Sequence, residues 1–269
     1  RIYLFAPGNG NMGNMRSTEP IGGNACHEPS VITPQSDNPA AEFTTLANVG
    51  VDGSGDERGI NAAALALCKG QPQSFWDELP SRADTDPVRI VCETVPPAER
   101  NCNSTGTGEA REPFFRSDAA TVVIIVSDEG DDTERNEQIP PPDWVSQCVL
   151  EHNDQPFFGE CDCKIQWWLE FFEGIDDLVV FANIGPTWQG PNDDVAWCDG
   201  TTLNFPGPCN AFGSSLCSID FYQQAACMTQ GLFTPIEVRA EGADLCDEAN
   251  FQDALTNVGA LISGLGRGW

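Results

Sequence analysis

Positive charge is what this sequence has least of. Only 13 of its 269 residues are lysine or arginine, against 41 aspartates and glutamates, and the formal net charge at pH 7 is −28. Nucleic-acid-binding proteins neutralise phosphates with Lys and Arg, and anionic membranes attract polybasic segments. We therefore expect neither nucleic acid nor a membrane surface as a partner. Such a charge favours solubility and the association of cations.

Long apolar runs are also missing. No stretch approaches the roughly 20 apolar residues that a membrane helix needs, so the sequence predicts no membrane insertion. A G-x-x-x-x-G-K-[ST] phosphate loop does not occur. The chain starts without the pattern of a signal peptide, and we expect a secreted protein from which the signal has been removed.

Histidine is scarce and cysteine is abundant. The two histidines, His27 and His152, and the absence of any C-x-x-C pair give little support to a zinc framework. An even set of twelve cysteines instead predicts disulfide bonds and an oxidising, extracellular compartment, with a pairing that spacing alone leaves open. The candidate cysteines are Cys26, Cys68, Cys92, Cys102, Cys148, Cys161, Cys163, Cys198, Cys209, Cys217, Cys227 and Cys246.

The strongest structural signal is the stretch 121–132. Its five consecutive β-branched aliphatic residues, 122–126, predict a strand buried on both faces, at the centre of a parallel sheet. An acidic turn follows at once, with Asp128, Glu129, Asp131 and Asp132. In open α/β sheets, ligands bind at the carboxyl ends of the strands. The turn is therefore either a cation site or a solvated loop.

Strand and helix signals alternate along the rest of the chain. Further strands are predicted at 2–6, 31–33, 88–92, 178–184 and 232–238, and helices at 56–68, 144–150, 164–172, 219–229 and 248–265. We expect Ser54 or Asp56 to cap the first of these helices, and Asp143 to cap the helix 144–150. The alternation favours βαβ crossovers and a doubly wound, mostly parallel α/β sheet flanked by helices. We predict a single domain over 1–269, with loop-rich insertions at about 13–53, 69–113 and 186–218.

The order of several segments resembles a von Willebrand factor A-like domain of the cysteine-rich, secreted bacterial type. These segments are 53–60, which opens a helix; 115–129, which contains the strand; 179–186; and 231–233 with 251–262. The resemblance covers most of 53–265. It implies a doubly wound sheet with a divalent-cation site built from an Asp-x-Ser-x-Ser loop, a Thr or Ser of a second loop, and an Asp after the central strand.

The resemblance assigns Ser54 to the second position of that site and Asp128 to the third. In the first loop Pro7 replaces the aspartate, and Asn9 and Asn11 replace the serines. Oxygen ligands suit Mg²⁺ and Ca²⁺, so the expected site is a weakened one. Its candidate ligands are Asp128, Ser54, Asn9, Asn11 and Glu129. The stretch between Met12 and Ser54 is short for the helix and strands that the family places there. We expect that the domain is abbreviated, that its true first strand preceded Arg1 and was lost, or that another chain supplies that strand.

These features favour an extracellular, non-enzymatic binding or adhesion module that contacts a protein partner. The alternative is a structural subunit that assembles with copies of itself into a fibre, pilus-like filament or coat. A donated strand would complete the sheet of such a subunit. An enzyme is disfavoured because the cysteines are expected to be paired, the histidines have no partner motif, and pairs of acids are too common to be informative.

Overall fold

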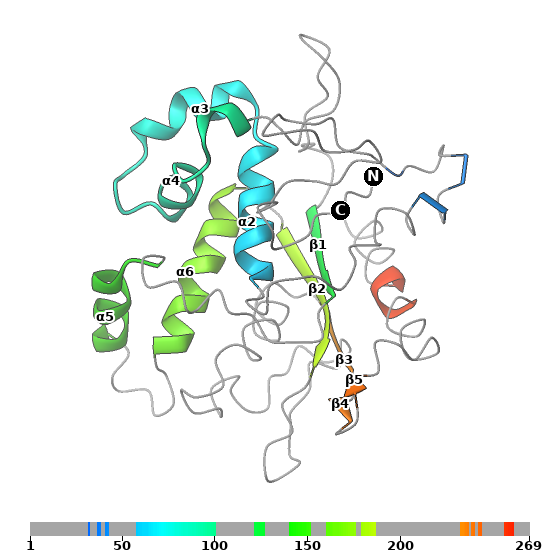
Figure 1. Ribbon diagram of the computed structural model, residues 1–269. Coiled ribbons are helices and arrows are strands. Elements are labelled where there is room, and N and C mark those ends of the chain that lie inside the picture. The colour runs from blue at the N-terminus through cyan, green and yellow to red at the C-terminus, as the bar shows by residue number, and fades with distance from the viewer. Residues whose placement is uncertain are drawn as a thin grey trace. The chain divides into compact units, whose positions relative to one another are not determined.

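The computed structural model describes Ile32 and residues 37–38, 41–42, 58–100, 121–126, 140–151, 160–175, 179–186, 232–236, 238–239, 242–243 and 256–260. Two compact units divide the chain, Arg1–Ala119 and Ala120–Trp269. The described helices of the first unit and the sheet of the second are labelled in Figure 1.

The second unit contains a parallel sheet. Strands β1 (Thr121–Val126), β2 (Val179–Pro186) and β3 (Leu232–Ile236) lie in the order β1-β2-β3, with Ile124 opposite Ala182 and Ile184 opposite Thr234. The predicted combination of helices with parallel strands is confirmed. Two short strands, β4 (Val238–Arg239) and β5 (Gly242–Ala243), form a separate antiparallel pair.

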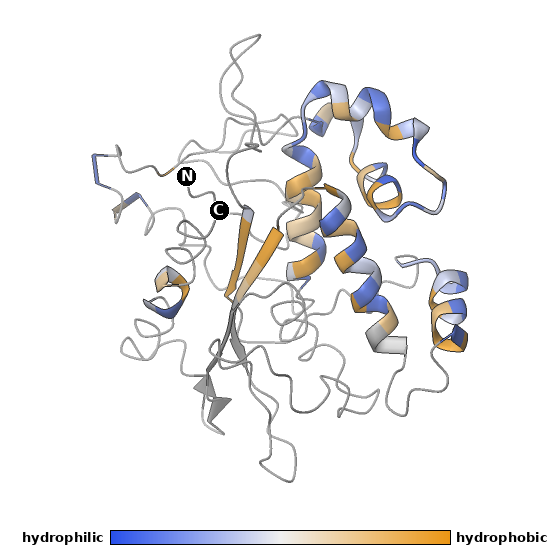
Figure 2. Ribbon diagram, turned by 180° about the vertical axis from the view of Figure 1, so that it is seen from behind, coloured by the Kyte–Doolittle hydropathy of each residue, from blue (hydrophilic) through white to orange (hydrophobic). Residues whose placement is uncertain are grey.

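Burial differs between the two faces of β1. Val123 and Ile125 are buried, whereas Ile124 is 38% exposed and Val126 is 45% exposed. The prediction of a strand buried on both faces is therefore wrong for β1. It is also β2, rather than β1, that lies between two partners among the described strands. A β-branched run indicates a strand. Whether both faces of that strand are buried depends on segments that are distant in the sequence. Figure 2 shows the apolar character of β1.

Helices α5 (Pro142–Glu151) and α6 (Glu160–Ile175) follow β1 in the chain and precede β2. Both are confirmed predictions, although α6 is longer than expected. α5 begins at Pro142, a residue favoured at the first helical position, so Asp143 lies in the first turn and does not cap the helix.

An aromatic chain connects α6 to the sheet. Edge-to-face contacts link Trp167 to Trp168 at 5.1 Å, Trp168 to Phe171 at 6.0 Å and Phe171 to Phe172 at 5.0 Å between ring centroids. Phe172 then meets Phe181 of β2 at 4.8 Å. Each of these rings is at most 2% exposed, so the aromatics of this helix are core residues. Such pairs add to the gain from burying the rings themselves.

A disulfide between Cys148 and Cys163 joins α5 to α6. Val145 is buried with the two cysteines, and Trp144 and Val149 pack against this cluster. The bridge gives α5 a covalent attachment that supplements a small apolar contact.

In the first unit, α2 (Gly59–Lys69) confirms the predicted early helix. All of its residues are buried, because alanines fill much of its surface and other segments can approach closely on every side. Arg58 occupies the N-cap position and makes no side-chain capping bond there. The predicted capping residues, Ser54 and Asp56, lie outside the described residues. A disulfide links Cys68 of α2 to Cys92.

Short helices continue from α2 to residue 100. They are α3 (Gln73–Glu78), η1 (Leu79–Ser81), α4 (Pro87–Cys92) and η2 (Pro97–Glu99), where η marks a 3₁₀ turn. The predicted strand at 88–92 is therefore wrong, and 70–100 is mainly helical rather than loop-rich. The reason is the start signal: the Asp86 carboxylate accepts a hydrogen bond from the Val88 N–H at 2.8 Å, and Pro87 stands at the first helical position.

Other predictions fall partly or wholly outside the described residues. The strand 2–6 and the helix 219–229 lie outside them, as does the insertion 186–218 except for Pro186 of β2. The single domain stays a prediction. Residues 256–260 are helical, as expected within 248–265, and Val258 is buried. No helix in the described segments is long and apolar enough to cross a membrane.

Candidate functional site

The carboxyl edge of the parallel sheet is the first candidate site. Val126, the last residue of β1, is in register with Ile184 of β2, and Pro186 of β2 is in register with Ile236, the last residue of β3. Parallel strands direct their carboxyl ends to one edge, where open α/β sheets bind ligands. Ser127, Asp128 and Glu129 follow β1 directly in the sequence.

The predicted metal ligands lie outside the described residues. This holds for Asp128, Glu129, Ser54, Asn9 and Asn11, so the structure neither brings them together nor separates them. Within the described ranges, no group of three or more His, Cys, Asp or Glu residues could hold a metal ion. The Mg²⁺ or Ca²⁺ site therefore stays a prediction.

Four of the predicted disulfide cysteines are paired, in the bonds Cys68–Cys92 and Cys148–Cys163. The side chains of the other eight cysteines are outside the described part of the chain. They belong to Cys26, Cys102, Cys161, Cys198, Cys209, Cys217, Cys227 and Cys246.

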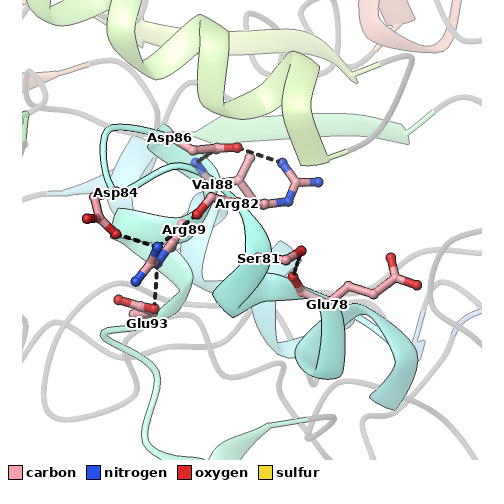
Figure 3. Close-up of polar contacts among 8 residues, drawn as sticks. All are labelled: Glu78, Ser81, Arg82, Asp84, Asp86, Val88, Arg89 and Glu93. Carbon is pink, nitrogen blue, oxygen red and sulfur yellow. Dashed lines mark hydrogen bonds and ion pairs between the residues drawn. The ribbon is translucent and has the colours of Figure 1, made fainter.

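Arg89 of α4 is the centre of a polar cluster (Figure 3). Its Nε donates to Glu93 Oε1 at 2.9 Å, and its Nη1 donates to the Arg82 carbonyl oxygen at 2.8 Å and contacts the Asp84 carboxylate. The hydrogen bond to Glu93 is the largest cause of a raised pKa for Arg89, and the charges of Glu93 and Asp84 add to it. The guanidinium thus stays charged and fixes the turn before α4.

Asp86 completes the same cluster. One carboxylate oxygen caps α4 through the Val88 N–H, and the other accepts from Arg82 Nη1 at 3.1 Å. The charges of Arg82, Asp84, Asp86, Arg89 and Glu93 have partners among these residues. Ser81 lies beside them in Figure 3, but its Oγ donates to the Glu78 carbonyl oxygen at 2.6 Å, and no histidine is drawn with it that could act as a base. The role of the cluster is to hold α4 in place.

A buried ion pair lies at the end of α2. Lys69 Nζ is 2.8 Å from Glu99 Oε2 of η2, with the two side chains 3% and 29% exposed. Burying a charge is costly unless it is paired. The Glu99 carboxylate therefore compensates a cation that sits in the interior of the first unit.

Arg100 follows Glu99 and lies over Trp76 of α3. The guanidinium carbon is 4.6 Å from the ring centroid, a cation–π distance. Both Arg100 Nε and Trp76 Nε1 are shielded from solvent and have no hydrogen-bond partner among the described residues. Sequence analysis missed this contact, because the two residues are 24 positions apart and belong to no repeating pattern.

Glu170 is the described carboxyl group with a raised pKa. Desolvation by the surrounding side chains raises the pKa most, and the charge of Glu173, one helical turn away on α6, raises it further. The side chain is nevertheless exposed. Two like charges at this spacing repel each other, and nothing beside them in the described residues suggests catalysis.

The described residues thus combine helices with a parallel sheet and two disulfide bonds. Comparison with protein-family models, with curated proteins and with solved structures found no match to the chain.

Proposed function

We propose that the chain is an extracellular, non-enzymatic binding module with a von Willebrand factor A-like fold and a weakened divalent-cation site at the carboxyl end of β1. The observation that carries this proposal is the strand order β1-β2-β3, all parallel, with Asp128 two positions beyond the end of β1. The partner in this proposal is another protein, contacted through the surface around the cation.

Strand order supports the fold part of the proposal. A doubly wound sheet has the order 3-2-1-4-5-6, so its second half contains three consecutive parallel strands that lie side by side. The strands β1, β2 and β3 have this arrangement. In that assignment β1 corresponds to the fourth strand, whose carboxyl end borders the point where the order reverses. That point is the usual place for a ligand in this class of sheet.

Covalent geometry supports the location of the cation ligand. Two residues span at most about 7 Å, so Asp128 cannot be far from the end of β1. Its carboxylate is a hard oxygen ligand of the kind that Mg²⁺ and Ca²⁺ prefer. Pro7 stands where the resembling family has a charged ligand, which lowers the expected affinity.

Disulfides support the compartment. Two bonds are present in the described residues, and bonds of this kind persist in oxidising environments outside the cytosol. The oxidising environment follows from the bonds, and secretion to the exterior is part of the proposal.

One glycine motif favours a different class, a dinucleotide-binding enzyme. Gly8, Gly10 and Gly13 have the G-x-G-x-x-G spacing. That fingerprint needs a helix directly after it. Pro20 follows only seven positions after Gly13 and would interrupt a helix in that place. Because the helix that this motif requires would be interrupted, the binding module is the better assignment.

A self-assembling structural subunit is the second candidate, favoured by the exposed Ile124 and Val126 on one face of β1. Light scattering of the native protein with and without EDTA separates the two. A monomer whose partner binding or conformation responds to the chelator supports the binding module. Large assemblies that resist the chelator contradict it and favour the subunit.

A further inference from the structure

We propose that Arg100, held against the face of Trp76, is a binding point for a carboxylate anion. This site is separate from the cation site at β1 and does not depend on it. It would give the first unit an anion-binding function in a chain that is otherwise strongly acidic.

The local fold places the guanidinium. Arg100 follows the 3₁₀ turn η2, whose Glu99 N–H donates to the Pro96 carbonyl oxygen at 2.8 Å. Trp76 is fixed in α3 and is only 3% exposed. The guanidinium therefore rests on a rigid aromatic surface, and stacking holds its planar group of donors in one orientation.

Among the described residues, no neighbouring acid balances the charge of Arg100. The ion pairs between described residues of 58–100 have Lys69, Arg82 and Arg89 as their cations. Glu99, the nearest carboxylate in the sequence, is engaged by Lys69. Within the described residues, Arg100 interacts with the Trp76 ring and has no carboxylate of its own.

The donors at this contact leave room for an acceptor. Arg100 Nε and Trp76 Nε1 are shielded and have no hydrogen-bond partner among the described residues. Arg100 is half-buried. A ligand can therefore approach the outer edge of the guanidinium and accept two parallel N–H bonds, the geometry that suits a carboxylate.

Charge decides between a carboxylate and a phosphate. One guanidinium neutralises one negative charge, and the chain carries a net charge of −28. A dianion would experience about twice the repulsion of a monoanion at the same distance. A monovalent carboxylate, either a small molecule or an acidic side chain of a peptide, is therefore the better match.

The test uses the ¹⁵N-labelled full-length chain and NMR. Sodium acetate is titrated against sodium chloride at a constant ionic strength of about 0.15 M, where the Debye length is roughly 8 Å. We expect the indole N–H signal of Trp76, identified by its loss in Trp76→Phe, to shift saturably with acetate and not with chloride. N-acetylglutamate amide forms a second arm. Tighter binding than acetate identifies a peptide side chain as the source, and equal or weaker binding identifies a small carboxylate.

Two variants complete the test. Arg100→Gln should weaken acetate binding by roughly tenfold or more, because a charged hydrogen-bond donor is lost. Arg82→Gln is the matched control, since Arg82 lies over Phe75 at 5.8 Å but is already paired with Asp86, and it should leave the response unchanged. The proposal is overturned if acetate and chloride give the same shifts, if inorganic phosphate binds more tightly than acetate, or if Arg100→Gln retains the response. If a variant fails to fold, the comparison of acetate, chloride and phosphate on the unmodified chain still tests the proposed carboxylate site.

Discussion

Residues 58–100 and residues 120–269 differ in how they use charge. The first stretch has five basic and six acidic residues, a net charge of −1, and the second has four basic and 25 acidic residues, a net charge of −21. In 58–100 the charges form local pairs such as Lys69 with Glu99 and Arg82 with Asp86. In the second region buried aromatic side chains join α6 to β2, and a disulfide joins α5 to α6. The first region therefore adds local ion pairs to the burial of α2, whereas in the second region the contact between helix and sheet is aromatic.

This difference agrees with the sizes of the apolar contacts. α3 and α4 contain six residues each and bury one and three residues respectively. Helices of this length are marginal by themselves, so the Asp86 cap, the ion pairs and the Cys68–Cys92 bond add to the little burial that each short helix provides. α6 contains 16 residues and contributes four large rings that are at most 2% exposed.

The largest expected effect comes from removing an aromatic ring between α6 and β2. Phe181→Ala should lower the free energy of unfolding by about 3–5 kcal/mol, because it leaves a cavity beside Phe172. Chemical denaturation monitored by circular dichroism measures the change. Leu150→Ala is the control, since Leu150 is 69% exposed and its loss should cost less than about 0.5 kcal/mol. Equal losses for the two variants would contradict the account of the second region.

Removing the disulfide of the first unit should come next in size. Replacing Cys68 and Cys92 together by serine should destabilise residues 58–100 by about 3 kcal/mol, since the bond closes a loop of 24 residues. Limited proteolysis with mass spectrometry locates the effect. New cleavage sites should cluster in 58–100. Cleavage that increases equally around β1 and β2 would show that the bond does not act locally.

The cap of α4 tests the polar contribution alone. Asp86→Ala should cost about 1 kcal/mol, because the Val88 N–H loses its acceptor. Asp86→Asn should be close to neutral, as asparagine caps nearly as well. Hydrogen exchange of the α4 amides provides the measurement. If both variants destabilise α4 equally, the ion pair with Arg82, and not the cap, is the important contact.

Substitution of Glu170 should have the smallest effect on stability, and this effect should depend on pH. Its pKa is raised above the ordinary value of 4.5 by desolvation and then by Glu173, so the folded chain holds this proton more tightly than the unfolded chain. Its ionisation therefore lowers stability as the pH rises from about 4 through the raised pKa, and the penalty is absent below that range. Glu170→Gln should be more stable than the parent at pH 7 by at most a few tenths of a kcal/mol, since the group is exposed.

The same pair of carboxyl groups offers a control. Glu173→Gln should lower the pKa of Glu170 towards its ordinary value, because one repelling charge is lost. Carbon-detected NMR titration of the side-chain carboxyl groups measures both values. A pKa of Glu170 that stays unchanged in Glu173→Gln would leave desolvation as the sole cause.

Local patterns in the sequence predicted much of the described fold. The β-branched run of 122–126 and the apolar run of 178–184 are strands, and the aromatic spacing of 164–172 is a buried helix. Each of these segments carries its own signal over several residues. Residues 88–92 form a helix instead of the predicted strand. Their β-branched side chains favour a strand, but Asp86 and Pro87 start a helix directly before them.

Contacts between distant residues could not be predicted in the same way. The pairings Cys68–Cys92 and Cys148–Cys163 depend on how helices approach each other, and twelve cysteines allow many alternatives. The exposure of Ile124 and the contact of Arg100 with Trp76 likewise depend on tertiary packing. The predicted cation ligands Asp128 and Ser54 lie outside the described residues, so the cation site stays a prediction from the sequence.

The central claim is that Asp128 anchors a divalent cation at the end of β1. Isothermal titration of the chelator-stripped chain with Ca²⁺ and with Mg²⁺ tests it most directly. We predict a weak single site that is lost in Asp128→Ala and retained in Asp143→Ala, an exposed acid of α5 that serves as the control. Identical isotherms for the parent chain and Asp128→Ala, or no binding to the parent chain, would contradict the account.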